Sequence, residues 1–334
     1  MIEISLIIFN FFIIFLINKF RIRIASFINL FDRPDKIRKF HKEDTPILGG
    51  IMIFIPFFLT SLYLFFFQNL DKIILIILCA CTCCFVIGLI DDLKTIAYKY
   101  KFFFLIIFFY LFIYQDPNLQ INKLYFSSFD KIYSLNSFGV HFTVLCLLLL
   151  TNSLNLIDGI DGLCILTSLL ILNWLMFIFS NFTIINIVLA ISLVYVFILN
   201  LKKNIFLGDS GSLFIGSIIG LNLIYNYNLQ SIDGFLPAEN IFIALMLPGL
   251  DMLRVFAIRI KNKKNPFIGD RNHFHHLLQQ KKFKLNSILI IFTLFTAMPI
   301  LINSFTIINP IVIILSFIIL YSYFVFYLKK KVTN

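Results

Sequence analysis

The chain has 334 residues, of which 60% are hydrophobic and only 13% are charged, and its mean hydropathy is +0.95. This balance excludes a soluble globular protein and predicts a polytopic membrane protein. The formal net charge is +11. In so hydrophobic a chain, basic residues that set membrane orientation and contact anionic lipid explain this excess, so no nucleic-acid partner is predicted.

Apolar segments along the chain predict the fold class, an all-α polytopic membrane protein that forms a single domain over residues 1–334. A transmembrane helix needs about 20 apolar residues, and about eleven segments qualify. In chain order they are roughly 2–20, 47–67, 72–91, 101–114, 140–157, 161–179, 182–200, 211–227, 239–259, 286–303 and 307–328. The longest loop between them, 115–139, is expected to hold a small hairpin.

The basic residues predict the orientation of these spans. Segments on one side hold 23 of the 28 Lys and Arg residues, and segments on the other side hold three Lys. The positive-inside rule then places the N-terminus outside and the C-terminus in the cytoplasm. We therefore expect a multi-pass protein of the cytoplasmic (inner) membrane. Its active-site face is expected to be formed by cytoplasmic loops 21–46, 92–101, 151–162, 201–211 and 260–285.

Two polar features come early in the chain. His41 belongs to a basic first cytoplasmic loop, which could attract a lipid phosphate or serve only as a topology determinant. Asp91 and Asp92 end the third span and are followed by lysines. Adjacent carboxylates repel each other, so the pair indicates a bound cation or a shared proton, although a solvated helix end is the simpler alternative.

A polar stretch follows the fifth span. Asn152, Asn155, Asp158 and Asp161 recur at intervals of three residues, which places them along one face if the stretch is helical. Acids near membrane depth are costly and are functional candidates for that reason. Glycines beside them allow the helix to end or a ligand to approach the backbone closely.

Two further clusters complete the polar inventory. Asp209 begins the eighth span, where it could cap the helix or hold a metal. The last large cytoplasmic loop carries Arg271, His273, His275 and His276. These histidines lack the spacing of a helical zinc pair, and imidazoles beside a guanidinium suit phosphate oxygens better.

In this order, the motifs resemble the polyprenyl-phosphate N-acetylhexosamine-1-phosphate transferase family, glycosyltransferase family 4, from Asp32 to His276. The resemblance rests on the Asp pair, the Asn-x-x-Asn-x-x-Asp-Gly-x-Asp-Gly stretch, the Gly-Asp-x-Gly turn and the His-x-His-His loop. The peptidoglycan branch typically has a Lys three positions after the second Asp and three consecutive His. Here Lys94 lies two positions after Asp92 and Phe274 interrupts the histidines, which favours the UDP-GlcNAc branch.

The resemblance implies transfer of GlcNAc-1-phosphate from UDP-GlcNAc to undecaprenyl phosphate, with release of UMP, as the start of a lipid-linked cell-surface glycan. The implied partners are a UDP-N-acetylhexosamine, a polyprenyl phosphate and the bilayer, with a homodimer left open. Mg²⁺, or alternatively Mn²⁺, is implied at Asp209 and Asn155. The implied catalytic residues are Asp91, Asp92, Asp158 and Asp161. The implied substrate-binding residues are Asn152, Lys99, Arg271, His273, His275, His276 and His41.

Two alternatives remain at this stage. The first is phospho-N-acetylmuramoyl-pentapeptide transfer in peptidoglycan synthesis. The second is an ion-coupled transporter, since intramembrane acids are common there. Transporters, however, place such acids near the midplane and often show internal repeats, whereas here the acids lie at cytoplasmic ends and the sequence shows no repeat.

Overall fold

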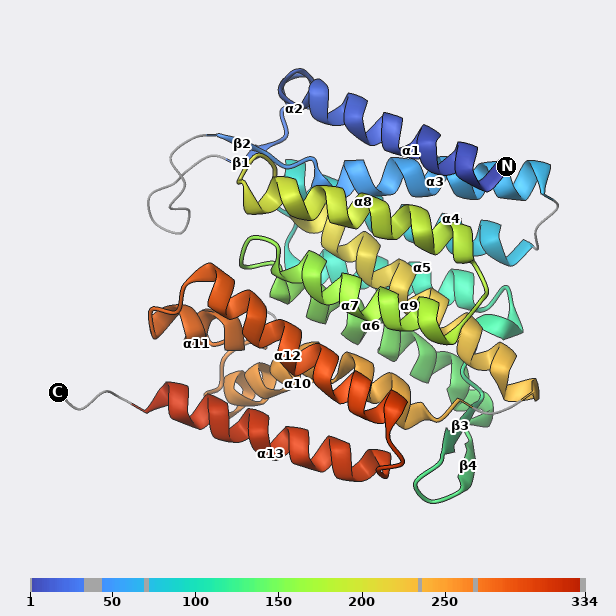
Figure 1. Cartoon of the computed structure of the whole chain (residues 1–334), viewed down its shortest axis with the longest axis vertical. Helices are drawn as coiled ribbons and strands as arrows, with labels where there is room; N and C mark the ends of the chain where they lie inside the picture. The colour runs from blue at the N-terminus through green and yellow to red at the C-terminus, as the bar shows by residue number, and fades with distance from the viewer. Residues whose placement is uncertain (1, 33–43, 69–71, 234–235, 267–269, 331–334) are drawn as a thin grey trace.

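The computed structural model describes residues 2–32, 44–68, 72–233, 236–266 and 270–330 (Figure 1). His41, one of the residues expected to bind substrate, lies outside the described residues. The helices are α1 (Ile2–Lys19), α2 (Arg21–Ile28), α3 (Gly49–Phe67), α4 (Lys72–Leu93), α5 (Tyr98–Ile113), α6 (Gly139–Ile157), α7 (Leu163–Ile178), α8 (Thr183–Leu201), α9 (Gly208–Asp233), α10 (Ala238–Lys261), α11 (Phe274–Gln280), α12 (Leu285–Phe305) and α13 (Pro310–Lys329). The strands are β1 (Phe31–Asp32), β2 (Thr45–Pro46), β3 (Lys123–Phe126) and β4 (Lys131–Ser134).

Every apolar segment predicted to cross the membrane coincides with one of these helices. Within the described residues, seven helices are long and apolar enough to cross a bilayer, or eight if α1 and α2, which meet at 69°, count as one span. The all-α multi-pass architecture is therefore confirmed. Of the other three predicted spans, α5 and α7 have only 16 residues each. The number of eleven crossings and the orientation of the termini stay predictions.

Helix α9 lies at the centre of the bundle and packs against α4, α6 and α3. Small residues permit these close approaches, as they do at many helix interfaces in membranes. A Cβ added to Gly216 would lie 2.6 Å from the Cα of Thr151 on α6. A Cβ added to Gly88 on α4 would overlap the backbone of Asp209 and Ser210. The start of α9 is thereby set directly against α4.

The two ends of the bundle differ, as Figure 1 shows. One end gathers α2, the β1–β2 ribbon, α11 and the last turn of α13, whereas the β3–β4 hairpin and the beginning of α1 lie at the other. Strands β3 and β4 pair antiparallel with Lys123 opposite Ser134, which confirms the predicted hairpin. The clustered acids and histidines belong to the end that carries α11, because α4 and α6 end there and α9 begins there.

Candidate active site

Asp92 holds the beginning of α9. Its Oδ1 accepts from the backbone N of Asp209 at 2.8 Å, and its Oδ2 accepts from the backbone N of Ser210 at 3.0 Å. The first amides of a helix have no partner within the helix, and its N-terminus favours negative charge. Gly208 precedes them with φ 76°, a left-handed backbone that suits glycine. Asp92 therefore fixes the place of Asp209, the residue expected to hold a metal.

Lys101 lies between two of the acids. Its Nζ is 2.9 Å from Asp91 Oδ2 and 2.5 Å from Asp209 Oδ2. The other oxygen of Asp91 accepts from the backbone N of Ile96 at 2.6 Å. The expected substrate-binding lysine, Lys99, is exposed on the first turn of α5. The lysine at the acid cluster is therefore Lys101, two residues further on, which was not among the residues expected to bind substrate.

Asn155 connects α6 to this cluster. Its Nδ2 donates to Asp209 Oδ1 at 2.7 Å and to Ser212 Oγ at 2.8 Å. Asn155 and Asp209, predicted to share a metal, are thus in direct contact. In this arrangement the amide presents its nitrogen to the carboxylate and orients it. Ser212 had no predicted role.

Helix α6 ends before the last predicted acids, which corrects the expectation that all four polar residues share one helical face. Asp158 is the residue after the helix, with ψ 32°, and Asp161 lies in the turn that leads to α7. Gly162 contributes to this break, since it has φ 76° and starts α7 from a left-handed conformation. Asn152 and Asn155 do share the helix.

Asp158 nevertheless lies near the other acids. Burial raises the pKa of its carboxyl group well above the usual value, and the charges of Asp209, Asp92 and Asp161 raise it further. Such mutual repulsion requires that the carboxylates converge at one place. A cation or a cationic donor at this cluster would relieve it.

The histidine loop reaches the same turn. A Cβ added to Gly159, the residue after Asp158, would lie 2.7 Å from His275 Nε2 and 3.4 Å from His276 Cε1. His275 is fully buried, and neither of its ring nitrogens has a hydrogen-bond partner among the described residues. Burial and the neighbouring His276 lower the pKa of His275 well below its usual value, so its ring is neutral at pH 7. His276 is partly buried, and the side chain of Arg271 is exposed.

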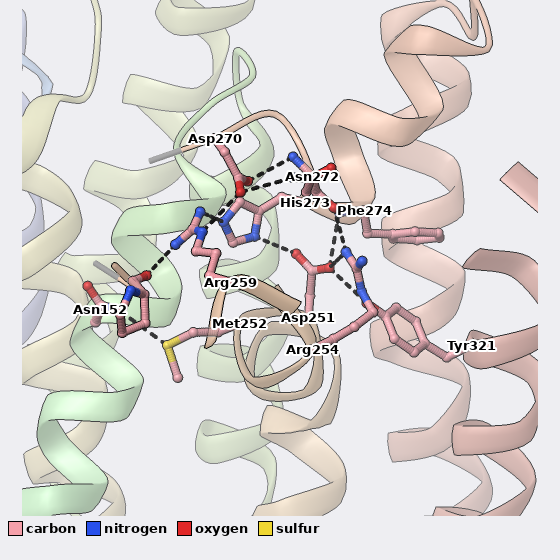
Figure 2. A network of polar contacts seen from close by, with 11 residues as sticks. Asn152, Asp251, Met252, Arg254, Arg259, Asp270, Asn272, His273, Phe274 and Tyr321 are labelled. Atoms are coloured by element: carbon pink, nitrogen blue, oxygen red, sulfur yellow. Dashed lines mark hydrogen bonds and ion pairs between the residues drawn. The ribbon is translucent and has the colours of Figure 1, made fainter. Parts of the chain in front are cut away.

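The third histidine points elsewhere, into the network that Figure 2 shows. His273 Nδ1 lies 2.9 Å from Asp251 Oδ2 on α10. Asp251 also accepts from Arg254 Nη2 at 2.7 Å, and this ion pair joins residues three apart on α10. Arg259 Nε lies 3.0 Å from Asp270 Oδ2. Burial raises the pKa of the Asp270 carboxyl group, but the hydrogen bonds from Arg259 and Asn272 outweigh burial and hold this pKa below its usual value. On α6, Asn152 donates to Met252 Sδ at 3.3 Å beside this network.

The donor set at the acid cluster fits a hard divalent cation. In the described part of the chain, no group of three or more His, Cys, Asp or Glu side chains is arranged to enclose a metal. Mg²⁺ does not require one, because it is usually bound by one or two carboxylates together with substrate phosphates. The ammonium of Lys101 between Asp91 and Asp209 marks a position that takes positive charge. Asp209 is the carboxylate best placed to hold such an ion, and Asn155 could join it by turning its amide oxygen inward.

An apolar groove runs alongside α6 and reaches Ser153, two residues before Asn155. It has a volume of about 530 Å³ and is lined by residues of α6, α9 and α10, including Leu147, Ile224 and Leu250. The β3–β4 hairpin lines its far end through Leu124 and Phe126. At the near end it reaches Met252, the partner of Asn152.

Comparison with known proteins identifies one similar family. The model of glycosyl transferase family 4 matches residues 74–226, which include the Asp pair, the Asn/Asp stretch and the Gly-Asp turn. The resemblance drawn from the motifs is thereby confirmed: over this region the chain is similar to glycosyl transferase family 4.

Several similar proteins are named undecaprenyl-phosphate alpha-N-acetylglucosaminyl 1-phosphate transferase. The protein of Thermotoga maritima is 28% identical over 274 residues, which cover 78% of this chain and 76% of that protein. That of Escherichia coli K12 is 26% identical over 310 residues, covering 83% and 76%. That of Salmonella typhi is 26% identical over 315 residues, covering 88% and 80%. These names indicate glycosyl-1-phosphate transferases.

Proposed function

We propose that the chain transfers N-acetylglucosamine-1-phosphate from UDP-GlcNAc to undecaprenyl phosphate, releases UMP and thereby starts a lipid-linked cell-surface glycan. The observation that carries the proposal is the convergence of Asp91, Asp92, Asn155, Asp158 and Asp209 with the His275 loop at one end of an apolar bundle. The names of the similar proteins support the choice of donor and acceptor. They also favour an enzyme over an ion-coupled transporter.

The acceptor has an apolar and a charged part, and the site offers a place for each. The groove beside α6 offers apolar surface to a polyprenyl chain, and it ends close to Asn152. The lipid phosphate would then reach Lys101, the cation at the acid cluster. A phosphate monoester has a second pKa of about 6, so most of the nucleophile is ionised at pH 7 without a base. Asp91 would mainly position it.

The donor is a nucleotide diphosphate, for which the site offers charge neutralisation. Mg²⁺, held by Asp209 and Asn155 when bound, would neutralise diphosphate oxygens. Phosphoryl transfer depends mostly on positioning and on stabilising the charge that develops on the leaving group. His275 and His276 lie beside Gly159. In this proposal they would donate hydrogen bonds to the leaving UMP, and Arg271 would add positive charge at the rim. The active-site face is cytoplasmic in this proposal, where the nucleotide is available.

The decisive experiment offers the purified full-length protein undecaprenyl phosphate, Mg²⁺ and a panel of UDP-sugars, and identifies the lipid product by mass spectrometry. We expect a lipid-linked N-acetylhexosamine phosphate from UDP-GlcNAc, with UMP as the second product. The panel includes UDP-MurNAc-pentapeptide, the donor of the peptidoglycan branch. A product from that donor alone would overturn the proposal in favour of the alternative branch.

A further inference from the structure

Asp251 is the most connected acid outside the acid cluster, and it is buried on α10. Its Oδ1 accepts from Arg254 Nη2 and from Tyr321 OH, each at 2.7 Å. The same oxygen accepts from the backbone N of Phe274, the first residue of α11, at 3.0 Å. A buried carboxylate is stable only when it is paired and hydrogen-bonded, and Asp251 meets this condition with partners from α10, α11 and α13.

The hydrogen bonds of His273 indicate which of its ring nitrogens carries a proton. A guanidinium has only donors, so His273 Nε2, which lies 3.5 Å from Arg259 Nη2, must accept. Nδ1 then carries a proton and donates to Asp251 Oδ2 at 2.9 Å (Figure 2). Both ring nitrogens of His273 are occupied inside the protein, and the side chain is only 3% exposed. His273 thus holds the loop and leaves phosphate contacts to its neighbours.

Phe274 is the second anchor of the loop. Its ring packs against Phe292 of α12 and Tyr321 of α13, at centroid distances of 5.5 and 5.4 Å. This packing is the physical reason for a phenylalanine between the histidines, because its ring fixes the loop to α12 and α13. With Phe274 fixed on one side, His275 is directed to the Gly159 turn, where its nitrogens have no partner among the described residues.

We propose that Asp251 is a positioning residue that acts through His275. It holds His273 Nδ1 and the Phe274 amide so that the unpartnered His275 imidazole faces the Asp158–Gly159 turn, where the diphosphate would lie. This inference rests on the proposed function for its chemical consequence. The positional claim itself stands on the contacts of Asp251 alone.

The kinetic test asks whether the effect of Asp251 depends on His275. Asp251→Asn places an amide where His273 Nδ1 needs an acceptor, and it is expected to lower kcat about 10- to 100-fold with a smaller change in the KM for UDP-GlcNAc. In a His275→Ala background the same substitution is expected to lower kcat less than about twofold, since the residue it positions is gone. Equal fold losses in both backgrounds would overturn the proposal.

A conservative variant adds a readout that general destabilisation would not produce. His273→Asn retains an amide donor near the position of Nδ1, whereas His273→Leu removes it. We expect His273→Asn to keep several-fold more activity than His273→Leu when Asp251 is present, and no such advantage in the Asp251→Asn background. An advantage that persists without the carboxylate would contradict the role of this hydrogen bond.

A measurement without turnover separates this inference from the proposed function. Diethyl pyrocarbonate modifies accessible imidazoles, and mass spectrometry reports the modification rate of His275. We expect the rate to rise several-fold in Asp251→Asn and to stay unchanged in the control Asn226→Ala, which breaks a buried amide pair with Asn222 on α9. An unchanged rate in Asp251→Asn would reject the positioning role. If wild-type protein transfers no sugar phosphate, the proposed function fails, and this rate still decides on Asp251.

Discussion

Among the clustered acids, neighbouring residues of one chemical type have different tasks. Both carboxylate oxygens of Asp92 accept hydrogen bonds from the first amides of α9. Asp91 and Asp209 instead share the ammonium of Lys101. The difference follows from geometry. Consecutive residues on a helix point about 100° apart, so Asp91 and Asp92 reach different groups at the beginning of α9.

Asp209 is the acid whose loss should affect chemistry most and folding least. Asp209→Asn keeps an oxygen for Asn155 but removes the charge that would hold a metal on the diphosphate. We expect turnover to fall about 100-fold or more while the thermal unfolding temperature stays close to wild type. A purified-enzyme assay together with a thermal unfolding curve checks this. Near-normal transfer by the variant would remove the metal role of Asp209.

Lys101 and Lys99 form a matched pair on the same helical turn. Lys101→Ala leaves Asp91 and Asp209 without the cation between them, so turnover should fall by roughly tenfold or more. Lys99→Ala, at an exposed position, should cost clearly less. Steady-state assays of the two variants, purified in parallel, measure the difference. A larger loss for Lys99→Ala would restore the residue expected from the motif.

At the scale of elements, the site is made by the ends of α4, α6 and α9 and by the α11 loop, and small residues bring these ends together. Gly88 lets α4 lie directly on the first residues of α9, and Gly159 lets the α6–α7 turn lie on His275. The site therefore depends on backbone contact between helices as much as on its own side chains.

A matched glycine pair tests this dependence. In Gly88→Ala the new methyl group meets the Asp209 and Ser210 backbone, which cannot shift cheaply, so stability should fall by about 1–3 kcal/mol, with loss of transfer. Gly249→Ala on α10 meets nothing within 4 Å and should gain up to about 1 kcal/mol, since Ala is the better helix former. Thermal unfolding in detergent compares them. Equal stability of the two variants would contradict the close packing of α4 on α9.

At the scale of the whole molecule, the arrangement separates a charged end from an apolar shaft. The acids, the lysine and the histidines lie at the end with α2 and α11, and the β3–β4 hairpin lines the apolar groove at the other end. A nucleotide in water and a lipid in the bilayer can meet only at such a boundary. This is the physical reason for placing the transfer there.

The orientation of this axis is open to a direct test. In a background without the native cysteines, Asp130→Cys in the hairpin turn should react with an impermeant maleimide on intact cells. Lys330→Cys, just after α13, should react only after the membrane is opened. The positive-inside rule predicts this arrangement, with the hairpin outside and the end of α13 in the cytoplasm. Labelling of both positions from the same side would contradict the seven crossings predicted between them.

The sequence by itself determined the membrane class, the helical segments, the hairpin, the family resemblance and the acids and histidines of the motifs, because hydropathy and motif spacing are local properties of the chain. Only the tertiary structure decided that Lys101 rather than Lys99 meets the acids, that Asp92 caps α9, and that His273 turns to Asp251 while His275 faces Gly159. Each of these depends on how the ends of helices distant in sequence pack against one another, and no local pattern carries that information.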